Sequence, residues 1–142
     1  MRRILALLLL GALLACSSDD DGRQNPFLVD IGFQFDINTS LPQYSTLNFP
    51  GTSVVVNSAG IRGFVIYHFN NEQYVAYELS DPNHAPNSCS TMTISGIEAT
   101  CPCTDDINKY NILTGRPIEG EGRFGMKAYR VVKSGNIIRV SN

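Results

Sequence analysis

The sequence lacks several patterns, and each absence argues against one class of fold or function. Apolar residues at helical spacing are almost absent after the first 15 residues, which argues against a helical fold. No basic patch is present, and with a formal net charge of −2 nucleic acid is not an expected partner. There is no Ser/His/Asp arrangement or other strong catalytic pair, so no enzyme is predicted. Gly120–Gly125 is glycine-rich but follows no strand-to-helix pattern, so it is not expected to bind phosphate.

The one long apolar run lies at the N-terminus. Ile4–Leu14 follows Arg2 and Arg3, and it is too short to span a bilayer as a helix, as is typical of a secretory signal. The segment Leu13–Cys16, "LLAC", resembles the bacterial lipobox, and this implies a lipid on the sulfur of Cys16. We therefore predict a lipoprotein signal peptide at residues 1–15. The alternative is an ordinary secretory signal in which the cysteine is incidental.

An acidic segment follows the predicted lipidation site. Residues 16–26 are expected to form a flexible tether, and the simplest interpretation of "SSDDDG" is a solvated linker. A run of acids directly after a lipidated cysteine also resembles the surface-export tag of some Gram-negative lipoproteins. The expected location is therefore the outer membrane or cell surface of a Gram-negative envelope. The lipid anchor would be the contact with the membrane, and an envelope protein is a possible partner.

Residues 27–142 are predicted to form one all-β domain, because short runs of Val, Ile, Tyr and Phe alternate with Gly, Pro, Asn and Ser. Strands or strand pairs are expected in 27–38, 41–56, 60–79, 91–100 and 128–141, without assigned partners. Several apolar and aromatic side chains are expected to be largely buried: Val65, Tyr67, Val75, Tyr77, Ile112, Tyr129 and Val131.

The number of cysteines limits the chemistry. If Cys16 carries lipid, then Cys89, Cys101 and Cys103 remain, an odd number in an oxidising compartment. The expected arrangement is one disulfide and one leftover thiol. A metal ion held by two or three of these sulfurs is the alternative.

The second half of the chain resembles the Rieske iron–sulfur domain. In that family two loops carry the cluster ligands, and here sixteen residues separate His84 in the first loop from Cys101 in the second. Tyr110, Thr114-Gly115 and a final hairpin then follow in the family's order. The resemblance covers about residues 60–140. It implies an all-β, Rieske-like antiparallel β-sandwich with a small cysteine-loop subdomain.

The chain departs from the family at the ligands. A Rieske cluster takes two cysteines on one iron and two histidines on the other. In register, His84 and Cys101 match two of these ligands, whereas Pro82 and Thr104 replace the other two. The resemblance therefore implies a domain that has lost the conventional cluster, has no cofactor and acts as a binding or structural module.

Two alternatives keep a metal at the loops. The first is a [2Fe–2S] electron-transfer protein that uses His84 and Cys101, with Cys89 or Cys103 as substitutes for the missing ligands. In that case the protein would be at most an electron-transfer component of an oxidoreductase. The second is a zinc module that uses His84, Cys89, Cys101 and Cys103, whose types suit zinc but whose spacing matches no common zinc motif.

The resemblance also implies a disulfide, because respiratory Rieske domains join an extra cysteine in each loop. Cys103 stands where the second of these cysteines would be, and Cys89 lies near the position of the first. A Cys89–Cys103 bridge is implied, with Cys89–Cys101 nearly as good. A Cys101–Cys103 bridge would be strained by the single residue between them.

The histidines and the acidic turn residues near the loops also have ordinary structural interpretations. His84 stands between prolines in a loop and is expected to be solvated, and His68 in an apolar strand is expected to be structural. Asp81, Asp105 and Asp106 are acidic turn residues of a kind usually solvated or bonded to backbone amides. They are also possible hard ligands beside His84.

Overall fold

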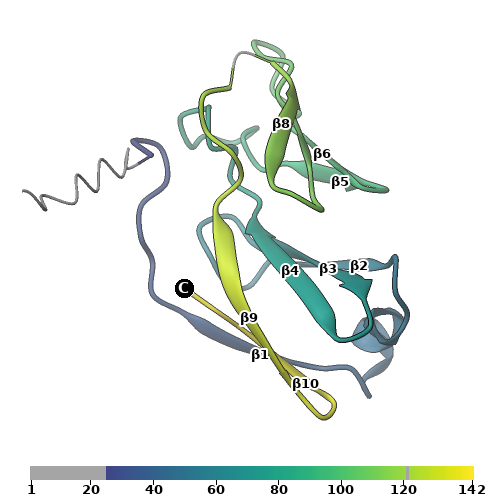
Figure 1. The fold of residues 1–142 in the computed structure, drawn as a ribbon. Helices are drawn as coiled ribbons and strands as arrows, with labels where there is room; N and C mark the ends of the chain where they lie inside the picture. The colour runs from purple at the N-terminus through teal and green to yellow at the C-terminus, as the bar shows by residue number, and fades with distance from the viewer. Residues whose placement is uncertain (1–24, 121) are drawn as a thin grey trace, which may run out of the picture.

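The computed structural model describes residues 25–120 and 122–142, and within them it contains strands and one short 3-10 helix at Pro42–Asn48 (Figure 1). The predicted signal peptide (residues 1–15), the lipidation site Cys16 and nearly all of the tether (residues 16–26) lie outside the described residues. No helix in the described residues is both long and apolar enough to cross a membrane.

The larger sheet has six antiparallel strands in the described chain. In spatial order they are β1 (Gln34–Asn38), β10 (Ile137–Ser141), β9 (Ala128–Ser134), β4 (Gln73–Glu78), β3 (Phe64–Asn70) and β2 (Ser53–Val56). Residues 130–134 of β9 pair with β10, whereas only Ala128 and Tyr129 of β9 pair with β4. Because this joint is short, the sheet curls there, and its two halves face each other across a shared core (Figure 1).

This first core explains the alternation in the N-terminal strand. Ile37 of β1 is fully buried, whereas Gln34 and Asp36 point to solvent. The core also takes residues from β10, β9, β2, β3 and β4: Ile138, Val140, Tyr129, Val56, Phe64, Ile66 and Ala76. Strands from both halves of the curled sheet thus bury apolar faces against each other, which is the arrangement of a β-sandwich.

A smaller sheet of four strands covers the outer face of the β3–β4 hairpin. Its strands are β5 (Thr93–Ser95), β6 (Glu98–Thr100), β7 (Lys109–Asn111) and β8 (Arg116–Glu119). A second core fills the space between them, with Val65, Tyr67, Tyr77 and Leu79 on one side and Ala99, Tyr110 and Ile112 on the other. The first five residues of β3 are therefore buried, since this strand packs on both faces.

The predicted all-β antiparallel sandwich with a small subdomain is confirmed. The hairpins expected at residues 60–79 and 128–141 form, and so do the two short strands around Ser95-Gly96. Five of the seven residues predicted to be buried are buried. Val75 and Val131 are only partly buried, because the β4–β9 ladder ends at Ala76–Tyr129 and the strands part beyond it around an open hollow.

Candidate functional site

Two loops of the small subdomain meet and are joined covalently. The first loop (residues 81–90) lies between β4 and β5, and the cysteine loop (residues 101–108) lies between β6 and β7. Cys89 and Cys103 form a disulfide with a Cα–Cα distance of 5.1 Å. This is the first of the pairings that the family resemblance implied. It fixes the first loop against the cysteine loop.

A buried carboxylate lies beneath the two loops. Asp81 has no exposed surface, and its Oδ1 accepts hydrogen bonds from the Tyr110 hydroxyl at 2.6 Å and from the Asn83 amide at 2.9 Å. Its Oδ2 accepts from Asn108 Nδ2 at 3.0 Å. Burial raises the pKa of Tyr110, and the neighbouring Asp81 raises it further, so the hydroxyl stays a donor. Asp81 is therefore a satisfied structural carboxylate. Of the two expectations for this turn residue, it is bonded to a backbone amide and not solvated.

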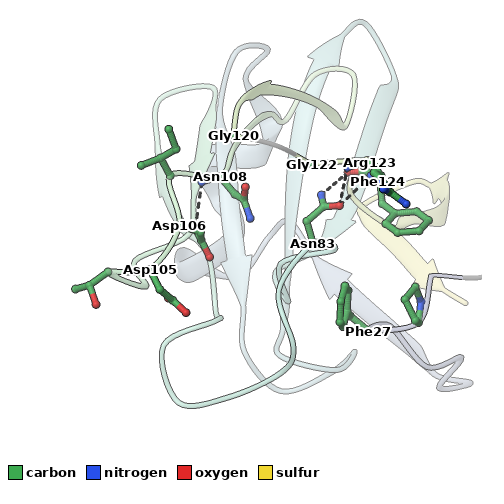
Figure 2. Close-up of a pocket in the computed structure, with 12 residues that line it drawn as sticks. Phe27, Asn83, Asp105, Asp106, Asn108, Gly120, Gly122, Arg123 and Phe124 are labelled. Atoms are coloured by element: carbon green, nitrogen blue, oxygen red, sulfur yellow. Dashed lines mark hydrogen bonds between the residues drawn. The ribbon is translucent and has the colours of Figure 1, made fainter.

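Asn83 attaches a third segment to this network (Figure 2). Its Nδ2 donates to the Tyr110 hydroxyl and to the Phe124 carbonyl, both at 2.8 Å. Its Oδ1 accepts from the backbone amides of Arg123 at 2.9 Å and Phe124 at 3.0 Å. A Cβ on Gly122 would lie 2.6 Å from Asn83 Nδ2, so glycine is needed for this close approach. The side-chain amide thus uses both donors and its acceptor to position the segment after β8.

The His84 side chain is not solvated as expected, because it lies between the two loops and is only 13% exposed. Its Nδ1 is 2.8 Å from the Ala85 carbonyl oxygen, and its Nε2 is 3.3 Å from Asp105 Oδ2 and 3.8 Å from Asp106 Oδ2. Partial burial lowers the pKa of His84, but the Ala85 carbonyl and the carboxylates of Asp105 and Asp106 outweigh it, so the pKa is raised overall.

Cys101 is the free cysteine of the described chain. It is 4% exposed, and its Sγ lies 3.4 Å from Asp106 Oδ2. Burial raises the pKa of this thiol to about 12, and the nearby Asp81 and Asp106 also favour the protonated form. Because the thiolate is the form that binds metal or attacks a disulfide, the thiol is inert in this environment.

The residues present do not fit a conventional [2Fe–2S] cluster, which needs two protein ligands on each iron. Pro82 has no ligand atom in its side chain, and its carbonyl accepts a hydrogen bond from Asn25 at 2.7 Å. Thr104 is exposed at the wall of a pocket. The disulfide also removes Cys89 and Cys103 as substitutes. It leaves the predicted zinc set of His84, Cys89, Cys101 and Cys103 two thiolates short.

An open pocket of about 770 Å³ lies beside the loops. Figure 2 shows Asp105, Asp106 and Asn108 at one end and Asn83, Arg123 and Phe124 at the other. Phe27 and Ile107 add apolar surface to the lining. The pocket is therefore bordered on one side by the acids that face His84.

The sequence identified some of these residues and missed others. It singled out His84 and the cysteines, and it named Asp81, Asp105 and Asp106 as possible hard ligands. It did not find Asn83, Asn108 or the role of Tyr110, which hold Asp81 and the 122–125 segment in place. The Asp-Pro-Asn sequence at 81–83 is typical of a side-chain-bonded turn and was the available signal.

Comparison with known proteins gives structural neighbours only. No family model matches the sequence, and no curated protein matches it significantly. One similar chain comes from a complex of reduced oxygenase and oxidized ferredoxin in carbazole 1,9a-dioxygenase, with 21% identity over 80% of this chain and 94% of that one and a TM-score of 0.49. Another is the ferredoxin of carbazole 1,9a-dioxygenase from Nocardioides aromaticivorans IC177, with 17% identity over 78% and 97% of the two chains and a TM-score of 0.46.

The layout expected from the sequence resemblance is present in the structure. A curled β-sandwich carries a small sheet, and the two loops that bear His84 and the Cys101–Cys103 pair face each other at that sheet. These features match the layout that the resemblance to the Rieske domain implies.

Proposed function

We propose that the protein is a non-catalytic, lipid-anchored envelope module with a Rieske-like domain that has lost the conventional [2Fe–2S] cluster and serves in binding or structure. The observation that carries this proposal is the Cys89–Cys103 disulfide. It uses the sulfurs that could have replaced the missing ligands, and it holds the two loops together without a cluster. A disulfide that closes a loop of about fifteen residues contributes about 3 kcal/mol in the chain-entropy model.

Three further features support the absence of a conventional cluster. Cys101 lies against the Asp106 carboxylate at 3.4 Å, a neighbour that favours the protonated thiol over a thiolate ligand. Asp81 and Tyr110 form a buried hydrogen bond beneath the loops. Asn83 ties the first loop to Phe124. These contacts between protein groups hold the two loops in place, so the loop geometry does not depend on a cluster.

The composition of the purified protein tests this function. The full chain, purified from a host that builds iron–sulfur clusters, should be colourless and contain far less than one iron per chain. Peptide mapping without reduction should find the Cys89–Cys103 crosslink. Two irons per chain with acid-labile sulfide and visible charge-transfer absorption would instead place the protein among electron-transfer components.

The anchor is tested separately. The lipid is proposed to attach to Cys16, so Cys16→Ala should leave an unprocessed precursor that no longer partitions into detergent as a lipoprotein. Cys101→Ser, which alters a cysteine outside the Cys89–Cys103 disulfide, should be processed and should partition like the wild type. If the Cys16→Ala protein is processed normally and stays in the detergent phase, the lipid anchor is wrong. Surface localisation is then judged by protease access in intact cells.

A further inference from the structure

Three ligand atoms from the two loops converge on one point beside the pocket. His84 Nε2 comes from the first loop, and a carboxylate oxygen comes from each of Asp105 and Asp106 in the cysteine loop. The nitrogen is 3.3 Å from one oxygen and 3.8 Å from the other, and all three atoms lie within 4.8 Å of one another. The Cys103 sulfur lies within the same 4.8 Å, but it is oxidised in the disulfide.

The hydrogen bond of the His84 imidazole shows that the space between these three ligand atoms needs a positive charge. A carbonyl oxygen only accepts, so the 2.8 Å contact between His84 Nδ1 and the Ala85 oxygen puts a hydrogen on Nδ1. In the neutral ring, the lone pair of Nε2 then faces two carboxylate oxygens. Three acceptors that face one another need a positive charge between them, and either a proton on Nε2 or a metal ion supplies it. A histidine whose other ring nitrogen donates to a backbone carbonyl is the usual arrangement of a metal ligand.

The two carboxylates differ in how they are held. Asp106 is 16% exposed, its Oδ1 accepts from the Asn108 amide at 3.1 Å, and its Oδ2 touches the Cys101 sulfur at 3.4 Å. Asp105 is 72% exposed and lies on the solvent side. One acid and the imidazole are therefore oriented by the fold, whereas the exposed acid can adjust its position. Coordination requires the 3.8 Å separation between His84 Nε2 and Asp106 Oδ2 to shorten by a few tenths of an ångström. The solvent side stays open to water or to another ligand.

The donor set and the spacing define the class of ion. One imidazole and two carboxylates suit divalent transition ions such as Zn²⁺, Fe²⁺, Co²⁺ or Mn²⁺. Bonds of about 2.1 Å place two ligand atoms about 3.0 Å apart at an octahedral angle and about 3.4 Å apart at a tetrahedral one. The observed separations of 3.3 and 3.8 Å are close to these values before any adjustment.

We propose that His84, Asp105 and Asp106 bind one divalent transition-metal ion at the mouth of the pocket, in place of an iron–sulfur cluster. This inference rests on the proposed loss of the cluster, because a cluster and a single metal ion would both use His84 as a ligand. The buried group of Asp81, Cys101 and Asp106 lies beneath this site. There the thiol supports Asp106 and does not bind the ion.

Cobalt(II) is the probe, because its spectrum reports the ligand type. The full chain, freed of metal with a chelator, is titrated with Co²⁺ and followed by absorption and by calorimetry. We expect one equivalent to bind, with visible d–d bands and no sulfur-to-cobalt charge transfer. His84→Ala and Asp106→Asn should each weaken binding by more than about 100-fold, the upper end of what loss of an outer hydrogen-bond partner typically costs. Zn²⁺ should displace the cobalt.

Control variants test whether the triad itself holds the ion. Asp36→Asn removes a surface carboxylate on β1 that pairs with Arg139 on β10. Both strands belong to the larger sheet and not to the two loops, so this variant should bind cobalt as the wild type does. Cys101→Ser keeps a hydroxyl donor beside Asp106 and should also bind without loss. If Asp106→Asn or His84→Ala fails to fold by near-UV circular dichroism, Asp105→Asn decides, because its side chain is exposed and its loss should abolish binding without unfolding the domain.

Each outcome supports or overturns the site. Cobalt binding that requires Cys101, or that shows thiolate charge transfer, overturns the proposed site. Wild-type protein that binds cobalt no more strongly than His84→Ala also overturns it. An assay of iron and acid-labile sulfide on the same preparation distinguishes the two proposals. A cluster in the purified protein overturns both, whereas a cluster-free protein that ignores Co²⁺ overturns the metal site alone.

Discussion

The hydroxyl of Tyr110 donates a 2.6 Å hydrogen bond to Oδ1 of Asp81, and neither residue has exposed surface. Asp81 begins the first loop and Tyr110 lies in β7, so this bond joins the loop to the floor of the small sheet. Asn83 donates to the same hydroxyl at 2.8 Å and extends the network to Phe124. The position of the first loop, and of His84 within it, therefore depends on a buried carboxylate and its donors.

Tyr110→Phe should reduce the free energy of unfolding by about 1–3 kcal/mol, because it removes one donor from a buried charged acceptor. Tyr67→Phe is the matched control. Tyr67 belongs to the same core, and its hydroxyl makes no hydrogen bond to the described part of the chain, so its cost should stay within about 0.5 kcal/mol. Urea unfolding of both variants measures the difference. Equal effects would show that the Asp81 bond has no net value.

Cys89→Ser should destabilise the domain by about 2–5 kcal/mol, the usual cost of losing a native disulfide from a small secreted domain. Cys101→Ser leaves the bridge intact and should cost less. Denaturant unfolding compares them, and mass spectrometry of unreduced peptides identifies the bridge. A crosslink that contains Cys101 would contradict the observed pairing.

Gly120→Ala should be more harmful than Gly135→Ala, although both glycines have positive φ. A Cβ at Gly120, where φ is +98°, would lie 2.3 Å from Asn108 Oδ1, whereas one at Gly135, where φ is +57°, meets open space. Backbone strain adds to this difference, because a φ of +57° lies in the left-handed region that other residues adopt and +98° lies outside it. The excess should be about 1.5–3 kcal/mol, the value of a hydrogen bond to a charged group, because the clash displaces Asn108 from Asp81. Thermal or urea unfolding of the two variants tests this, and equal losses would refute it.

Tyr129 should make stability fall at alkaline pH. Burial raises the pKa of Tyr129 above its ordinary value of 10.0, and the hydrogen bond to Glu78 raises it further. The stabilisation is thus fully present below pH 10, where both states keep the proton. Above pH 10 the unfolded chain ionises first, and stability should fall by about 1.4 kcal/mol per pH unit until the folded state also ionises.

Tyr129→Phe isolates this contribution, because the other tyrosines remain in both proteins. The difference in unfolding free energy between wild type and variant, measured in urea at pH 9, 10 and 11, should shrink at the last step. A difference that does not change with pH would show that the phenol is not protected in the fold.

The elements with strong local patterns were predictable. Alternation over residues 27–38 predicted that Ile37 points inward and Asp36 outward, and the dense apolar run at 60–69 predicted a central strand, which the structure has as β3. The strand β7 was not predicted, because it is short and has polar residues on both sides of Tyr110. It exists because it pairs with β6 and β8, a cross-strand gain that periodicity does not record.

The sequence by itself determined the all-β class, the principal hairpins, the two loops and the identity of the side chains they carry, because these follow from spacing along the chain. Tertiary structure alone decided that Cys89 pairs with Cys103, that Asp81 is buried against Tyr110, and that His84 faces Asp105 and Asp106. Each of these pairs joins residues 14 to 29 positions apart. Local patterns extend over a few residues, so the meeting of two loops is set by the sheets that carry them and by the core packed between those sheets.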